Sequence, residues 1–252
     1  MVAIERDRWL AERRTIVGAS EVAAILGVNA YSSAYEVWAR KRGLIDDDAS
    51  MREAVEWGNR LEPVIAAAYA ERTSRTLIDH GRHHLLRHPA WPLGCTLDRE
   101  IDCRPPEVLE VKTTGQHHGE EWEGDVAPLR YVVQVQAQLA VTGYERGVLA
   151  CLLGGQRLVV RQVERDDALI AEIGEAVCDF WRLVETGTPP DPDGSQATRR
   201  VLKALHPRDS GATIDLGDEI AVAVAEWEAA KADEKAAKGR KETAESILFA
   251  AV

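Results

Sequence analysis

The chain has 252 residues, 45% of them hydrophobic and 29% charged, which is ordinary for a globular protein able to bury a sizeable core. No apolar run is long enough to span a bilayer and the N-terminus is charged throughout, so we expect a cytoplasmic protein with no membrane partner. The net charge of −11 lowers the expectation of nucleic-acid binding without excluding it, because DNA meets the local field of one groove.

Helices are predicted first along the chain. Residues 15–26 begin with a glycine turn and continue as an apolar helical stripe, with Ser20 as the helix N-cap. Two further helices are predicted at residues 32–42 and roughly 50–72.

Strands follow the helices. Runs typical of strands lie at residues 76–78, 83–87, 94–103 and 108–114. The last two flank the turn signal Arg104-Pro105-Pro106-Glu107, and together they predict a hairpin.

The pattern then returns to alternating helices and strands. A helix at residues 131–143 is closed by Gly143. A strand pair is predicted at 147–155 and 157–163, and a helix at 166–186.

The C-terminal part has a different composition. Residues 186–200 are rich in Pro, Gly and Asp and mark a boundary or an exposed loop. From Asp218 to Leu248 the chain has no proline and much Ala, Glu and Lys, which predicts a long helix that is coiled-coil or partner-binding. We therefore expect one domain over residues 1–205 and a helical extension over 206–252. The apolar stripe of this helix is Ile220, Val224 and Trp227.

The segment VLEVKTT, residues 108–114, holds an acid and a base two positions apart. In a strand, Glu110 and Lys112 point to one face while Leu109 and Val111 point to the other. A solvated strand face is the ordinary interpretation of an isolated pair, so its meaning depends on what accompanies it.

Several acidic and amide residues accompany the pair. Asp98 lies at the start of the first hairpin strand, and Glu62 lies on the helix before it. Gln134 begins a stripe on the next helix that continues at Gln138, an amide that backbone groups could equally satisfy.

This set can hold a divalent cation. Mg²⁺ takes oxygen ligands from one or two carboxylates and keeps positions for water and a substrate phosphate. Asp98 and Glu110 can supply the carboxylates, with the carbonyl of Val111 as a further oxygen. Lys112 beside the metal can orient or help deprotonate the attacking water and steady charge on the phosphorus oxygens.

Four blocks of sequence carry a family resemblance. They are Trp9-x-x-x-Arg13 followed by GASEV at 18–22, WGNRLEP at 57–63, GCTLD at 94–98 with LEVK at 109–112, and YVVQVQAQLAVTG at 131–143. In this order they resemble the lambda-type exonuclease or YqaJ-type viral recombinase family of the PD-(D/E)xK nuclease superfamily. Leu97 stands where the superfamily's naming proline would be.

The resemblance implies an α/β chain of the α+β-like restriction-endonuclease fold, with a central mixed sheet flanked by helices and a C-terminal helical extension. It implies a deoxyribonuclease that uses two Mg²⁺ ions per site, with Mn²⁺ as a substitute. Such an enzyme digests linear double-stranded DNA from the 5′ end and leaves 3′ overhangs for a single-strand annealing protein in phage-type recombination. It also implies a homo-oligomer, a ring trimer, in a bacterial or phage-infected cell.

Site roles follow from the resemblance residue by residue. Asp98 and Glu110 would be metal ligands, and Glu62 would lie near or on the second metal. Lys112 would be the catalytic lysine, and Gln134 would position Lys112 or the water.

A pocket for the 5′-phosphate of the DNA end is also implied. Its residues fall on Arg13, Ser20 and Thr96. Ser20 at a helix N-terminus would offer backbone N–H groups to a phosphate, and Arg13 could add a bidentate contact.

Some assignments have rivals. Asp102 shares the predicted strand of Asp98 with even spacing but abuts the turn. Glu53 and Glu56 lie on the same helix as Glu62, where solvated positions are the simpler interpretation.

Two other functions stay open. One is a structure- or site-selective endonuclease on the same core, and the other is a catalytically silent DNA-binding scaffold that acts through its helical tail. The intact Asp98, Glu110 and Lys112 argue against the second.

Overall fold

The computed structural model describes residues 2–46, 52–208, 211 and 217–251. It divides into two compact units, Met1–Pro207 and Arg208–Val252, and each is described by itself. The sequence-based boundary after residue 205 lies next to this division. The first residues of the helix predicted at 50–72 lie outside the described part.

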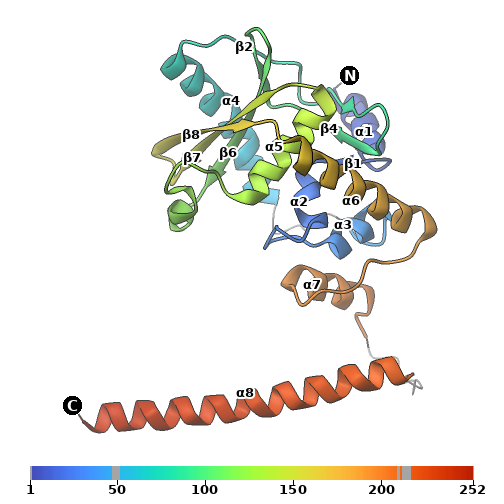
Figure 1. The fold of residues 1–252 in the computed structure, drawn as a ribbon, viewed down its shortest axis with the longest axis vertical. Coiled ribbons are helices and arrows are strands. Elements are labelled where there is room, and N and C mark those ends of the chain that lie inside the picture. Colours follow the sequence, from blue (N-terminus) through green and yellow to red (C-terminus); the bar gives the residue numbers. More distant parts are fainter. Residues whose placement is uncertain (1, 47–51, 209–210, 212–216, 252) are drawn as a thin grey trace. The chain divides into compact units, whose positions relative to one another are not determined.

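The first unit is built on a five-stranded mixed sheet (Figure 1). In spatial order its strands are β2 Leu77–Ile78, β5 Arg99–Ile101, β6 Glu107–Thr114, β7 Arg146–Leu153 and β8 Arg157–Glu164. β6 and β7 are parallel, whereas the other neighbours are antiparallel. The mixed α/β fold predicted from the family resemblance is confirmed, as are the strand pairs β5–β6 and β7–β8.

A second, small sheet holds β1 Val17–Gly18, β4 Leu93–Cys95 and β3 Leu86–Arg87 in that order. The single strand predicted at 94–103 is therefore wrong, because it divides into β4 and β5, which belong to different sheets. Between them Leu97 turns into the core while the Asp98 carboxylate accepts the N–H of Val111 on β6. A side-chain bond replaces the strand ladder at this break.

Seven α-helices are described in the first unit. They are α1 Val2–Arg13, α2 Val22–Ile25, α3 Ala34–Lys41, α4 Arg52–Thr73, α5 Leu129–Thr142, α6 Asp167–Thr186 and α7 Gln196–Leu205. α5 ends where predicted, at Gly143 in the left-handed region with φ 73°. α7 begins inside the segment predicted as a boundary or loop, where Ser195 caps it by accepting the N–H of Thr198.

The prediction that Ser20 caps a helix is wrong. Ser20 lies within the 3₁₀ turn η1, Ala19–Glu21, and Gly18 is the N-cap. The Glu21 side chain accepts the Gly18 N–H at 2.7 Å, because the chain arrives extended from β1 and the glutamate three residues on reaches back to it. α2 has four residues, so no helix dipole of useful size stands behind Ser20.

Helices cover both faces of the large sheet. α4 packs on one face, where Ile65 and Tyr69 meet Leu109 of β6. α5 covers the other, which carries Val108, and α6 packs against α5. Glu110 points to this second face and is 3% exposed, so the interpretation of β6 as a solvated strand is wrong.

The second unit is one long helix, α8 Asp218–Ala250, and the long helix predicted there is confirmed. The side chains of residues 220–251 are exposed. Among the described helices none is long and apolar enough to cross a membrane.

Gly94 offers a test of how tightly β4 packs. A Cβ at this position would lie 2.5 Å from Ile16 Cδ1 and 2.6 Å from the carbonyl oxygen of Leu86, and the latter cannot rotate away. We expect Gly94→Ala to lower the free energy of unfolding by about 1–3 kcal/mol, measured by urea denaturation. Gly58→Ala on α4 is the control, because nothing lies within 4 Å of its Cβ and helix propensity favours alanine. Equal stability of the two variants would contradict this packing.

Candidate active site

The site forms on β6 beside the break between β4 and β5. Lys112 Nζ donates to Glu110 Oε1 at 2.5 Å, and the N–H of Val111 donates to Asp98 Oδ2 at 2.8 Å. The β5–β6 ladder places Arg99 opposite Leu109, so Asp98 reaches β6 one step beyond the ladder. The break thus brings Asp98 to the strand that carries Glu110 and Lys112.

Two glutamines of α5 hold the carboxylate of Glu110. Gln134 Nε2 donates to Oε1 at 2.5 Å and Gln138 Nε2 donates to Oε2 at 2.6 Å. The two residues are one helical turn apart, so their amides leave the same face of α5. The sequence leaves it open whether backbone groups satisfy the Gln138 amide. In the structure this amide donates to Glu110 and holds its carboxylate in place. Within the described residues its buried Oε1 has no hydrogen-bond partner.

Burial and nearby charge shift the protonation equilibria of this group. Burial, and then the negative charge of Glu110, raise the pKa of the Asp98 carboxyl well above its ordinary value. Burial alone would lower the pKa of the Lys112 ammonium, but Glu110 and Asp98 hold it above its ordinary value. Lys112 is therefore a cation that donates a hydrogen bond to Glu110 and lies in the field of Asp98.

Glu62 lies near the site but is engaged elsewhere. Its carboxylate pairs with Arg99 at 2.8 Å and Arg82 at 3.4 Å, and its charge contributes to the raised pKa of Asp98. Its rival Glu56 is exposed and pairs with Arg60. The other two rivals, Glu53 and Asp102, are exposed.

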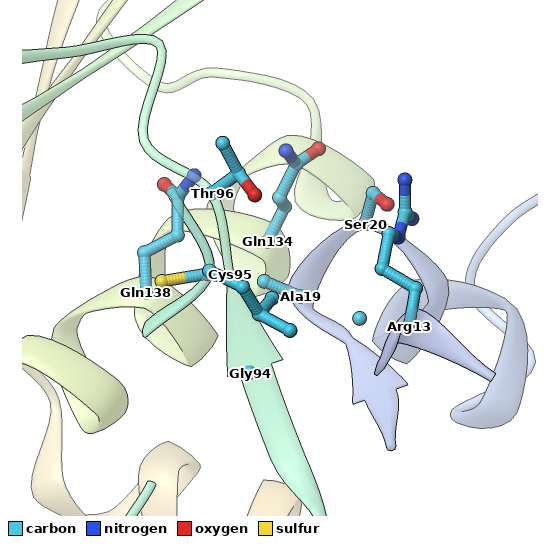
Figure 2. A pocket seen from close by; sticks show the side chains of 10 residues that line it. Arg13, Ala19, Ser20, Gly94, Cys95, Thr96, Gln134 and Gln138 are labelled. Carbon is cyan, nitrogen blue, oxygen red and sulfur yellow. The ribbon is translucent and has the colours of Figure 1, made fainter. Parts of the chain in front are cut away.

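The three residues assigned to a 5′-phosphate line one pocket of about 70 Å³, together with Gln134 and Gln138. Figure 2 shows Arg13 and Ser20 side by side on one wall, with Thr96, the residue after β4, across from them. In the described part of the chain, the Arg13 guanidinium has no carboxylate partner and instead lies 4.8 Å from the ring centroid of Trp9. The pocket shares its glutamines with the Glu110 site, so the two adjoin.

Sequence reasoning gave no role to several supporting residues. Trp9 Nε1 donates to Thr96 Oγ1 at 3.2 Å and so ties α1 to the pocket. Lys41, 5% exposed at its side chain, pairs with Glu21 at 2.6 Å and donates to the carbonyl of Arg13 at 3.0 Å. Trp9 stands in a matched block and could have been found there. Lys41 carries no such signal.

The donor set suits a hard divalent cation. Asp98 and Glu110 are adjacent buried carboxyl groups, and a bound cation would offset the burial and the repulsion that raise the pKa of Asp98. The N–H and carbonyl of one strand residue face the same neighbour, so the carbonyl of Val111 faces the side of Asp98. No three His, Cys, Asp or Glu side chains of the described residues gather as a metal-binding group. Asp98, Glu110 and the Val111 carbonyl offer oxygen ligands, the kind that Mg²⁺ prefers, and Mg²⁺ would need water and phosphate to complete its shell.

The chain is similar to known proteins in sequence and in fold. Residues 8–145 match the family model described as YqaJ-like viral recombinase domain. The uncharacterised protein YqaJ of Bacillus subtilis is 35% identical over 218 residues, covering 84% of this chain and 67% of its own. The crystal structure of an alkaline exonuclease, LHK-Exo, from Laribacter hongkongensis is 27% identical with a TM-score of 0.58, covering 72% of this chain and 94% of its own. LHK-Exo in complex with dAMP is 25% identical with a TM-score of 0.59 and covers the same shares.

The glutamine clamp on Glu110 can be tested through stability. Gln138→Leu keeps the volume but removes the donor to Glu110 Oε2, leaving a buried carboxylate oxygen without that bond. We expect the free energy of unfolding to fall by about 1–3 kcal/mol in chelator, measured by urea denaturation. Gln162→Leu on the exposed side of β8 is the control and should change it by less than about 0.5 kcal/mol. An unchanged Gln138→Leu variant would show that this amide does not support Glu110.

Proposed function

Because the chain belongs to the YqaJ-like viral recombinase family, we propose that it is a Mg²⁺-dependent exonuclease that digests linear double-stranded DNA from the 5′ end. The likeness to an alkaline exonuclease supports a phage-type nuclease, and the dAMP bound to that relative supports a nucleotide substrate. We propose in addition that the enzyme depends on Mg²⁺, that it digests from the 5′ end and that its substrate is double-stranded.

One observation carries the proposal: the Asp98–Glu110–Lys112 group adjoins the pocket of Arg13, Ser20 and Thr96 through shared glutamines. A terminal phosphate in the pocket and a scissile phosphate at the carboxylates would belong to the same strand. This arrangement favours cleavage near an end over cleavage within a chain.

Asp98, Glu110 and the Val111 carbonyl are the residues proposed to hold Mg²⁺, or Mn²⁺ in its place. When bound, the ion would lower the pKa of a coordinated water and neutralise charge on the phosphate. The second ion implied by the resemblance would require Glu62 to exchange its pairing with Arg99 for the metal.

The chain's own residues have separate tasks in this proposal. Gln134 and Gln138 hold both oxygens of Glu110, so the carboxylate cannot rotate away from its place on β6. Lys112, as an ammonium, would donate to the attacking water or to the phosphate oxygens rather than remove a proton. Asp98 is held by the backbone of β6 and so would keep its distance from Glu110 constant.

The biological setting is also a proposal. The products would be 3′ single-stranded overhangs, used by a single-strand annealing protein in phage-type recombination. We propose a homo-oligomer, a ring trimer on the family pattern, as the assembly that encloses the DNA end.

Lys112→Ala tests the assigned chemistry. We expect digestion of linear duplex in Mg²⁺ to fall at least about a thousandfold, because one charged donor to the transition state is lost, while DNA affinity changes little. Gel assays measure the rate, and fluorescence anisotropy in Ca²⁺ measures binding. Lys203→Ala, on the exposed face of α7, should digest normally.

Two substrates separate this function from its rivals. Covalently closed circles should stay intact, and their cleavage would favour the endonuclease. The wild-type protein could also stay folded but show no activity on linear duplex in Mg²⁺ or Mn²⁺. That result would favour the catalytically silent DNA-binding scaffold.

The phosphate pocket predicts a preference for phosphorylated ends. A 5′-phosphate gains charge-assisted hydrogen bonds that a hydroxyl cannot make, so it should be digested about tenfold faster or more, a difference of roughly 1.4 kcal/mol. Arg13→Ala should bring the phosphorylated rate down towards the hydroxyl rate and leave the hydroxyl rate nearly unchanged. Arg14→Ala, next to it but exposed, should keep the preference. Equal wild-type rates on both ends would remove the pocket from the mechanism.

A further inference from the structure

α8 has one line of uncharged residues along its whole length. The line runs from Val222 to Ala250 in steps of alternately three and four residues, the spacing of the a and d positions of a coiled coil. Its central members are Ala229, Ala232, Ala236 and Gly239. All described positions on the line are exposed, and side chains this small let a second helix approach to about 8 Å.

The larger apolar residues on the other side of α8 do not make a comparable line. Ile220, Val224 and Trp227 are followed at the same spacing by Lys231 and then Glu234. The Lys231 ammonium already lies 4.8 Å from the Trp227 ring centroid. The apolar stripe expected from the sequence therefore ends after two turns, and the uncharged line is the longer contact surface.

Charges beside the uncharged line favour one orientation of a partner helix. In a parallel pair, Glu228 would face Asp233 of the second copy, and Lys235 would face Arg240 of it. Both contacts are between like charges. In an antiparallel pair centred between Ala237 and Lys238, Asp233 faces Arg240 and Lys235 faces Glu242, and the two-fold axis repeats both.

We propose that α8 pairs antiparallel with α8 of a second copy of this chain in this register, a two-fold contact separate from the one that would close a ring trimer. Ala225 then packs beside Ala250 of the second copy, and Ala236 beside Gly239 of it. A second copy of α8 fits this surface because the acidic positions of the helix face its own basic positions when one copy is reversed.

The ends of the pair add apolar burial. Ile247 and Phe249 flank Ala250 and are 66% and 80% exposed in the single chain. In this register they lie level with Glu228 and Glu226 of the second copy, on either side of its Ala225. The central charges thus set the orientation, and the apolar ends add the attraction that a line of alanines lacks.

Single cysteines on the full chain test the orientation directly. Ala225→Cys and Ala250→Cys should each remain uncross-linked alone under mild oxidation, because like positions lie roughly 37 Å apart in an antiparallel pair. An equimolar mixture of the two variants should give a disulfide-linked dimer on a non-reducing gel. The wild-type chain controls for Cys95, Cys103, Cys151 and Cys178, which are free thiols of the first unit.

Each outcome decides the proposal. Cross-linking of Ala225→Cys alone would show a parallel pair and overturn it. No cross-linking in the mixture would also overturn it, since α8 would then lie on its own chain, on another protein, or alone. The test needs no nuclease activity, so it stands apart from the proposed function.

Charge reversal gives a second, independent measurement. Asp233→Lys with Glu242→Lys, or Lys235→Glu with Arg240→Glu, turns each central contact into a repulsion in the homodimer. We expect each double variant alone to associate about tenfold or more weakly in sedimentation equilibrium. An equimolar mixture should recover wild-type association, because every central contact is then between opposite charges. A mixture as weak as its components would overturn the register.

Discussion

The buried carboxylate of Glu110 is the constraint on which the site depends. A charge on a covered sheet face is costly unless it is paired and hydrogen-bonded, and here Lys112, Gln134 and Gln138 satisfy both of its oxygens. This requirement fixes the rotation of α5 over the sheet, because both glutamines must face β6. It also explains why an acid and a base stand two apart on a strand whose neighbours are apolar.

The elements closest to this carboxylate are those that sequence predicts best. β6 and α5 carry strong local patterns, a β-branched run and an amphipathic stripe ended by Gly143. The break at residues 96–98 could not be predicted, because alternation of apolar and polar residues continues through it. What interrupts the strand is the tertiary bond from Val111 to Asp98, and no local propensity records such a bond.

The phosphate pocket shows a second limit of sequence reasoning. Block similarity names Arg13, Ser20 and Thr96, and the structure brings these three distant residues together. Block similarity does not name Lys41, whose buried ammonium joins Glu21 to the end of α1. Burial lowers the pKa of Lys41, so its charged form is costly at this position. The expectation that Ser20 begins a helix failed because a glutamate, not the serine, satisfies the free N–H of Gly18.

The net charge of −11 is compatible with a DNA end as substrate because charge in this chain is locally arranged. Glu62 and Glu107 are each held by two arginines, so much of the acidity near the sheet is already paired. Arg13 is among the described cations that have no carboxylate partner, and it lines the pocket beside the Glu110 site. A bound cation would lower the repulsion between the carboxyl groups of Asp98 and Glu110, so the acidity at this point favours the proposed Mg²⁺ and, through it, a phosphate.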